Sequence, residues 1–336
     1  MRKKVCILYT GGTIGMVRTD KGFAPAPGTF ARELDAIRDM SSPDMPEWDL
    51  IEFDPLLDSS NITYRQWNQI AAAIESRYDD YDGFVVLHGT DTMAYSASAL
   101  SFMLEGLGKP VIFTGSQIPL SELRSDGKDN LITSVLIASQ GIVREVCLYF
   151  SNVLLRGNRA TKDSADRMIA FRSPNYAELA KAGIDMEYRS RTFLDTEEDS
   201  KLTVRYLKDT SLGVIKVFPG IKFELFTPIV EDMQGLILEA FGTGNIPNYD
   251  KALTDLIEQA AKRGTIVVVC TQCPQGSVRL GAYEAGSELV RAGAVNGYNM
   301  TTEAAVAKLS YLLSQDLSTQ QIRELMQTNL RGELTI

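Results

Sequence analysis

The segment Val5–Gly15, VCILYTGGTIG, joins a short apolar run to a loop of small and hydroxyl-bearing residues. An unbroken run of this length and composition favours a buried β-strand, and the paired glycines that follow it mark a turn. We therefore predict a first strand at Val5–Tyr9 whose carboxyl end opens into the loop Thr10–Gly15. In open parallel sheets, ligands bind beyond that end of the strands.

Outward from this segment, β-rich runs alternate with helical patterns, which is typical of parallel strands joined by crossover helices. The clearest helix begins where Thr63 and Gln66 form a capping-box pattern, with Trp67, Ile70, Ala71 and Ile74 on one face. The other strands expected are Leu50–Phe53, Phe84–His88, Val111–Thr114 and Val146–Phe150, and the other helices are Phe30–Arg38, Thr92–Leu107 and Asn130–Ser139. This pattern predicts a doubly wound, flavodoxin-like α/β domain.

Between residues 187 and 208 the sequence becomes charged and weakly periodic, which favours a linker. The βα pattern then resumes with strands at Gly213–Val217, Gly235–Leu238 and Ile266–Cys270 and helices near Tyr249–Ala261, Thr302–Ser314 and Thr319–Met326. A chain of 336 residues also exceeds the size at which a single core stops growing. We expect a larger N-terminal α/β domain at 1–186, a linker at 187–208 and a smaller C-terminal α/β domain at 209–336.

The composition is that of a soluble globular protein, with 44% hydrophobic and 23% charged residues. The 34 basic residues are outnumbered by 43 acidic ones, and a net charge of -9 disfavours a nucleic-acid partner. The apolar run after Lys4 is shorter than the ~7–15 residues of a signal-peptide core. No run reaches the ~20 apolar residues of a membrane helix. We therefore expect a cytoplasmic protein that binds neither nucleic acid nor a membrane.

The cysteines Cys6, Cys147, Cys270 and Cys273 are expected to be reduced thiols rather than a disulfide framework. Cys270 and Cys273 have the spacing of a redox or zinc motif. A second such pair is missing, and His88 is the only histidine of the chain. The favoured interpretation is a pair of thiols at a strand end, without a metal.

The loops after the predicted strands are rich in small hydroxyl residues. They are Thr10–Thr13, Asp58–Asn61, His88–Thr92 and Gly115–Gln117. Because these loops share one edge of the sheet, we expect hydroxyl groups and the carboxylate of Asp91 to gather there. A dinucleotide site is disfavoured, since the glycines do not match G-x-G-x-x-G and residues 21–28 interrupt the chain before a helix begins.

A hydrolase at this edge needs a proton acceptor. His88 ends an apolar strand, and a hydrogen-bonded turn residue is favoured over a general base. Lys162 follows the apolar run Val153–Leu155, and composition alone favours a solvated surface lysine. A lysine acts as a base only where desolvation or a cationic neighbour lowers its pKa. Tyrosine is the other residue type available for this role.

These residues resemble the L-asparaginase family, and specifically its bacterial cytosolic (type I) branch. The two signatures of the family stand here as Tyr9–Gly15, YTGGTIG, and Val86–Met93, VLHGTDTM. The supporting segments follow in the order of the family and are Asp58–Thr63, Thr114–Pro119, Leu155–Lys162, Gly242–Asn245 and Leu330–Thr335. The resemblance therefore spans nearly the whole chain and implies a two-domain asparaginase fold.

The resemblance implies an amidohydrolase that converts L-asparagine and water to L-aspartate and ammonia without a metal or cofactor. Thr13 would attack the side-chain amide carbon and form an aspartyl ester that water then cleaves. Thr90 would activate the attacking water or nucleophile through Lys162, and Asp91 would hold the α-ammonium group of the substrate. The residues implied in substrate binding are Ser59, Ser60, Asp91, Ser116 and Asn245.

Two positions depart from the pattern of the family. Phe23 stands where family members usually place a tyrosine that transfers the proton of the nucleophile; its ring can close over the substrate but cannot relay a proton. Either Lys162 and Thr90 carry out the acid–base chemistry of both steps, or another tyrosine enters the site. At Glu239 some cytosolic members carry an arginine that lines an allosteric asparagine pocket, while Thr161 and Cys273 are retained.

Three alternatives stay open. The same residues would serve a glutaminase or a subunit of a tRNA amidotransferase, and the preference for asparagine or glutamine depends on room for one methylene. With Phe23 in place of tyrosine, the chain could also be an inactive amino-acid-binding protein. The family further implies a homodimer or homotetramer.

Overall fold

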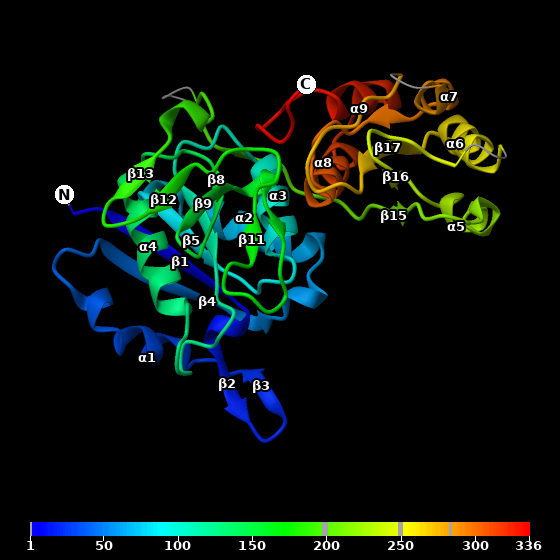
Figure 1. The fold of residues 1–336 in the computed structure, drawn as a ribbon. Coiled ribbons are helices and arrows are strands. Elements are labelled where there is room, and N and C mark those ends of the chain that lie inside the picture. Colours follow the sequence, from blue (N-terminus) through cyan, green and yellow to red (C-terminus); the bar gives the residue numbers. More distant parts are fainter. Residues whose placement is uncertain (1, 197–200, 248–250, 282–283) are drawn as a thin grey trace. The chain divides into compact units, whose positions relative to one another are not determined.

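The computed structural model describes residues 2–196, 201–247, 251–281 and 284–336. The chain forms two compact units, Met1–Arg205 and Tyr206–Ile336, each with a sheet of its own (Figure 1). The division falls within residues 187–208, the segment predicted as a linker. That segment contains the end of strand β13 (Met186–Tyr188) and the short strand β14 (Thr203–Val204).

The first unit contains an eight-stranded sheet in the order β13-β12-β9-β8-β7-β5-β1-β4. Strands β4, β1, β5, β7 and β8 pair in parallel. Counted along the chain, their order is 2-1-3-4-5, so the predicted flavodoxin-like arrangement is confirmed. The bounds are β1 Lys4–Gly11, β4 Glu47–Leu57, β5 Gly83–Leu87, β7 Val111–Thr114, β8 Val146–Phe150, β9 Val153–Arg156 and β12 Ala180–Ala182.

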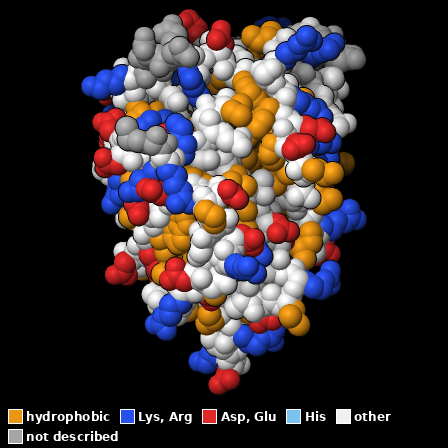
Figure 2. Space-filling model, turned by 90° about the vertical axis from the view of Figure 1, so that its left-hand side faces the viewer, with side chains coloured by type: hydrophobic (Ala, Val, Ile, Leu, Met, Phe, Trp, Pro, Cys, Tyr) orange, Lys and Arg blue, Asp and Glu red, His pale blue; other side chains and the backbone are white. Residues whose placement is uncertain are grey.

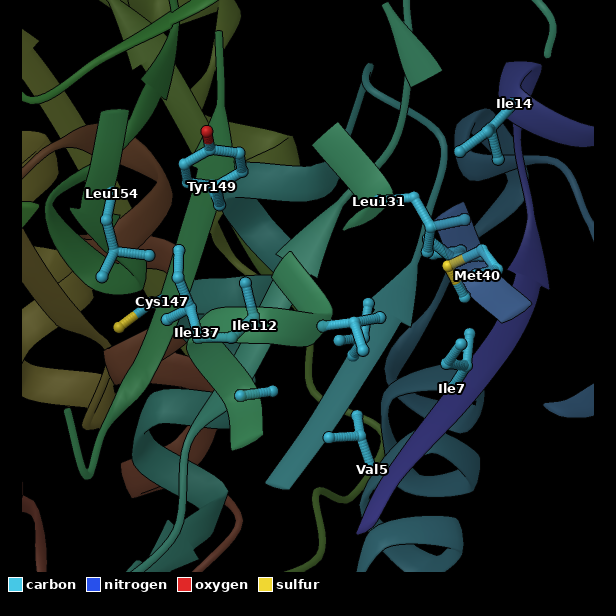
Figure 3. Close-up of a cluster of buried hydrophobic side chains, with 14 of the residues drawn as sticks. Val5, Ile7, Ile14, Met40, Ile112, Leu131, Ile137, Cys147, Tyr149 and Leu154 are labelled. Carbon is cyan, nitrogen blue, oxygen red and sulfur yellow. The ribbon is translucent and has the colours of Figure 1, made fainter. Parts of the chain in front are cut away.

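The central strands are buried on both faces, which explains why they stand out in the sequence as unbroken apolar runs. All residues of β5 and β7 are buried. On one face, Val5 and Ile7 of β1 and Ile112 of β7 belong to a core cluster that also contains Leu131 and Ile137 of the helix α4 (Figure 3). The helices of the unit are α1 Phe30–Asp35, α2 Tyr64–Glu75, α3 Met93–Met103 and α4 Gly127–Gln140.

The helix boundaries show where local signals suffice. The capping box predicted for α2 is confirmed, because Gln66 Oε1 accepts from Thr63 N–H at 2.9 Å and Thr63 Oγ1 accepts from Arg65 N–H at 3.3 Å. The predicted helix end at Leu107 was wrong. The helix α3 ends at Met103, and the next two residues form β6 (Leu104–Glu105), which pairs with the distant strand β14. The predicted end at Arg38 was also wrong, since α1 ends at Asp35.

Several short strands of the first unit were not predicted. Immediately after Thr13–Gly15 the chain forms an antiparallel hairpin of β2 (Met16–Thr19) and β3 (Gly22–Pro25). A second small pair consists of β10 (Thr161–Lys162) and β11 (Phe171–Arg172). These strands are only two to four residues long, too short for a period-two pattern to be recognised.

The second unit has a parallel sheet in the order β15-β16-β17-β18, as the resumed βα pattern predicts. Its helix α9 has the predicted bounds, and α6 begins at Ala252; Tyr249, at the predicted start, lies outside the described residues. The strands are β15 Leu212–Lys216, β16 Gly235–Ala240, β17 Ile266–Thr271 and β18 Val295–Asn296. The helices are α5 Thr227–Val230, α6 Ala252–Arg263, α7 Glu284–Ala292, α8 Thr302–Leu313 and α9 Thr319–Met326.

The surface carries charges of both signs. On the face drawn in Figure 2, lysine and arginine side chains are interspersed with aspartate and glutamate. Within the described ranges, the helices are too short or too polar for any of them to cross a membrane.

Candidate active site

The candidate catalytic loops lie at the carboxyl ends of β1 and β5, between which the strand order of the parallel sheet reverses. Open α/β sheets bind ligands at this switch point. Thr13 begins a single 3-10 turn (Thr13–Gly15) directly after β1 and is half-buried. Thr90 and Asp91 follow β5; the side chain of Thr90 is buried and that of Asp91 is exposed.

Glycines allow the loops after β1, β4 and β5 to pack against one another. Gly12 has a φ of +89°, and a Cβ atom there would lie 2.4 Å from the backbone nitrogen of Gly89. A Cβ atom at Gly89 would lie 2.4 Å from Ser59 Oγ. Thr92 Oγ1 also donates to the carbonyl oxygen of Ser59 at 2.7 Å. The loops after β1, β4 and β5 are therefore in direct contact, and side chains at positions 12 and 89 would separate them.

Lys162 connects the two candidate residues that follow β5. Its Nζ donates to Thr90 Oγ1 at 3.0 Å and to Asp91 Oδ1 at 2.5 Å. The lysine side chain is 20% exposed and that of Asp91 is 68% exposed. Lys162 reaches this position because β10 pairs with β11, with Lys162 opposite Phe171. The solvated surface lysine favoured by composition alone is thus contradicted by its contacts.

Gln117 is a contact residue of this cluster that sequence reasoning missed. Its Oε1 accepts from Thr90 Oγ1 at 3.2 Å, while its Nε2 donates to the carbonyl oxygens of Ala165 at 3.3 Å and Arg167 at 3.0 Å. Since two carbonyls face the amide nitrogen, the amide oxygen must face Thr90. The hydroxyl of Thr90 therefore donates to Gln117 and accepts from Lys162.

The segment that carries Ser116 and Gln117 is held by Asp126. The carboxylate of Asp126 accepts from the backbone N–H groups of Gln117 at 3.0 Å and Ile118 at 3.1 Å. Ser116 is 1% exposed, and its Oγ has no hydrogen-bond partner among the described residues. A buried hydroxyl in this loop is available to a polar group of a ligand.

Two consecutive segments of the chain match two family models. Residues 4–193 match "Asparaginase, N-terminal" and residues 212–326 match "Glutaminase/Asparaginase C-terminal domain". This chain belongs to the asparaginase family.

Other members of the family resemble the chain over its full length. L-asparaginase 1 of Escherichia coli (strain K12) is 47% identical, with 99% of this chain and 98% of that protein covered. The crystal structure of L-asparaginase I from Vibrio cholerae has a TM-score of 0.93 at 46% identity and covers 100% of both chains. The L-asparaginase of Thermococcus kodakarensis has a TM-score of 0.89 at 31% identity, with 99% of both chains covered. The predicted two-domain asparaginase fold is confirmed.

Within this asparaginase fold, His88 is a buried structural residue. Its Nδ1 donates to the carbonyl oxygen of Gly89 at 2.7 Å, and its Nε2 lies 2.9 Å from Ser96 Oγ. Trp67 Nε1 donates to the same Ser96 oxygen at 2.8 Å. Burial lowers the pKa of His88 to about 4, so the ring is neutral at pH 7. These contacts agree with the turn role favoured from the sequence over a general base.

The remaining family positions are spread over both units. In the first, Ser59 is buried, Ser60 is exposed, and Phe23 on β3 is 45% exposed. Asn245 belongs to the second unit, where its backbone forms a bridge with Phe241, and it makes none of the contacts described above. Glu239 on β16 accepts from Thr302 Oγ1 at 2.5 Å, so its carboxylate is engaged within the second unit.

Proposed function

We propose that this protein hydrolyses L-asparagine to L-aspartate and ammonia through an acyl-enzyme on Thr13. The observation that carries the proposal is the contact of Lys162 with both Thr90 and Asp91 beside the nucleophile loop. An amide is a poor electrophile, and covalent catalysis divides its hydrolysis into two easier steps. The full-length similarity to L-asparaginases supports this reaction.

In the first step, Thr13 Oγ1 bonds to the amide carbon of the substrate side chain, and the C–N bond breaks. The proton of Thr13 is delivered to the leaving nitrogen, which departs as ammonia. In the second step, water attacks the aspartyl ester and gives one proton back to Thr13. Aspartate is released and the enzyme is regenerated, with no oxidant, reductant or cofactor needed.

Because Phe23 has no hydroxyl, we assign proton transfer in both steps to Thr90 and Lys162. The proton of Thr90 is engaged by Gln117, and one lone pair of its oxygen accepts from Lys162. For the transfer itself, Thr90 passes its own proton to Lys162 in the neutral amine form and takes up the proton of Thr13 or of the attacking water. Lys162 then returns a proton to the leaving nitrogen in the first step and to Thr13 in the second. Loss of a general acid–base group typically costs about 10²–10⁴-fold in rate.

Substrate recognition would use charge and hydrogen bonds. One oxygen of Asp91 is bound to Lys162, and its exposed carboxylate would bind the α-ammonium group. Ser59, Ser60 and Ser116 are the proposed donors to the substrate carboxylate and amide, and Asn245 is a further proposed contact on the strength of the family resemblance alone. Phe23 is proposed to close over the bound substrate.

Glutamine is a second candidate substrate, since the matching C-terminal family model covers glutaminases as well as asparaginases. The machinery is the same and the substrate is longer by one methylene, a difference worth only about 1–3 kcal/mol. Measuring kcat/KM for both amino acids decides between them.

We also propose a cytoplasmic location and a homodimeric or homotetrameric state. The location is supported by the four cysteines, all of which are free thiols, as is usual in a reducing compartment. The oligomeric state is supported by the resemblance to the family and is measured by analytical ultracentrifugation.

An ammonia-release assay on purified protein tests the function. Wild type is expected to release ammonia from asparagine, Thr13→Ala to lose this activity, and the matched control Thr254→Ala on α6 to keep it. No activity in wild type, together with binding of intact asparagine in calorimetry, would favour the inactive amino-acid-binding protein. Unchanged activity in Thr13→Ala would remove Thr13 from the mechanism.

A further inference from the structure

The hairpin of β2 and β3 begins immediately after the nucleophile turn and carries Phe23. Arg18 and Phe23 are directly opposite in its antiparallel register. The Arg18 guanidinium carbon lies 5.1 Å from the centre of the Phe23 ring, within the range of a cation–π contact. The orientation of the aromatic ring is therefore coupled to the position of this arginine.

The same guanidinium group binds a carboxylate outside the hairpin. Arg18 Nε donates to Glu122 Oε1 at 3.1 Å, and Arg18 Nη2 donates to Glu122 Oε2 at 3.2 Å. This is the two-pronged geometry that arginine forms with carboxylates and that lysine cannot form. The Arg18 side chain is 71% exposed and that of Glu122 is 27% exposed.

Glu122 belongs to the segment that follows β7 and begins with Ser116 and Gln117. A backbone bond joins this segment to the nucleophile turn, since Leu120 N–H donates to the carbonyl oxygen of Ile14 at 2.9 Å. The hairpin is thus attached to the segment after β7 by two contacts. One is at the base of the hairpin, through Ile14, and the other is farther along the hairpin, through Arg18. The base contact uses the backbone, whereas the second contact depends on one side chain.

We propose that Arg18 is a positioning residue, which fixes the hairpin and the ring of Phe23 against the segment that carries Ser116 and Gln117. This inference rests on the proposed function, because it assumes that the hairpin covers bound asparagine. Without the arginine, the hairpin would occupy this position for a smaller fraction of the time. The apparent affinity for substrate falls in proportion to that fraction, while the groups that break the amide bond are unchanged.

The experiment compares Arg18→Met and Glu122→Gln with a matched control. Arg205 and Glu105 form an exposed ion pair in the same unit, with Nε to Oε2 at 3.1 Å and the glutamate side chain also 27% exposed. Arg205→Met therefore removes a similar ion pair that does not involve the hairpin. We expect Arg18→Met to raise KM for asparagine about two- to fivefold, the size typical of exposed ion pairs, with kcat within twofold of wild type. Arg205→Met should leave KM unchanged.

Two further variants sharpen the test. Arg18→Lys keeps the charge but loses the two-pronged bond, and is expected to raise KM by an intermediate amount. The exchanged pair Arg18→Glu with Glu122→Arg is expected to bring KM back toward the wild-type value. A simple effect of net charge predicts no change in Arg18→Lys, which keeps the charge of wild type, whereas a dependence on the two-pronged bond predicts a raised KM.

Hydrogen exchange provides a readout that does not depend on catalysis. Backbone amides of residues 16–24 should exchange several-fold faster in Arg18→Met than in wild type or Arg205→Met. Unchanged exchange and unchanged KM in Arg18→Met would overturn the proposal. If wild type does not hydrolyse asparagine, the proposed function fails, and the exchange rates still decide whether Arg18 holds the hairpin.

Discussion

Thr90 illustrates how much of the proposed chemistry depends on single atoms. Its hydroxyl has one proton and two lone pairs. The hydroxyl proton forms a hydrogen bond to Gln117, Lys162 donates to one lone pair, and the other lone pair is left for a reacting group. A residue that sequence patterns do not single out, Gln117, thereby determines which way the Thr90 hydroxyl points.

The first prediction concerns Gln117. Gln117→Met keeps the length of the side chain but removes both the acceptor for Thr90 and the donor to Ala165 and Arg167. A neutral hydrogen bond contributes about 1 kcal/mol, so we expect kcat/KM for asparagine to fall about five- to tenfold. Steady-state kinetics measures this, with Gln315→Met, on a glutamine just after α8, as the control. Wild-type kinetics in Gln117→Met would show that Thr90 does not need this acceptor.

The elements fall into those that the sequence predicts and those that only tertiary contacts create. Buried strands such as β5 and capped helices such as α2 carry their signals locally. The end of α3 depends instead on β14, which lies about a hundred residues away in sequence. The β2–β3 hairpin and the two-residue strand that carries Lys162 were likewise missed, because their short strands carry too few residues for a pattern.

The residues of the candidate site likewise fall into those that the sequence predicts and those that only the structure reveals. The loops after β1, β4 and β5 and the residues Thr13, Thr90 and Asp91 follow from the signatures. Composition alone could not identify Lys162, which required the family resemblance. Neither source identified Gln117 or Arg18, because their roles depend on partners that are 27 and 104 positions away in the chain.

The second prediction concerns the link from β5 to the helices α2 and α3 through His88, Ser96 and Trp67. In the folded protein, burial lowers the pKa of His88 to about 4, whereas in the unfolded chain the ordinary value is about 6.5. Between these values the unfolded state binds the proton, so the free energy of unfolding decreases as pH falls from 6.5 to 4. The full effect is roughly 3 kcal/mol.

Urea denaturation of wild type and His88→Gln over this pH range isolates the contribution. Protonation of His88 is lost in the variant, so the stability advantage of wild type over His88→Gln should shrink by roughly 3 kcal/mol between pH 7 and pH 4. An advantage that stays constant would show that His88 does not titrate in this way.

For the molecule as a whole, one feature that bears on stability is a buried ion pair outside the candidate site. In the second unit, Lys308 of α8 and Glu333 near the C-terminus form an ion pair at 2.5 Å, and both side chains are fully buried. Lys308 also donates to the carbonyl oxygens of Met326 and Thr328, and Glu333 accepts from the backbone of Leu330 and Arg331. The pair therefore attaches the C-terminal residues of the chain to α8.

The third prediction follows from this burial. Lys308→Met leaves the carboxylate of Glu333 buried without its cation, which typically costs about 3–5 kcal/mol. Lys308→Met combined with Glu333→Gln removes the uncompensated charge and should recover part of the loss. Chemical denaturation measures both variants. A loss below about 1 kcal/mol in Lys308→Met, or no recovery in the double variant, would show that an uncompensated carboxylate at Glu333 is not what destabilises this unit.

Mass spectrometry of the enzyme during turnover tests most directly whether Thr13 is the nucleophile. The protein is mixed with asparagine, quenched in acid within the steady state and digested. The wild-type digest should contain a peptide that includes Thr13 and carries an aspartyl ester, and the digest of Thr13→Ala should contain no such ester. Ammonia release with no ester on the enzyme, or with the ester on Thr90, would contradict the assignment of Thr13 as the nucleophile.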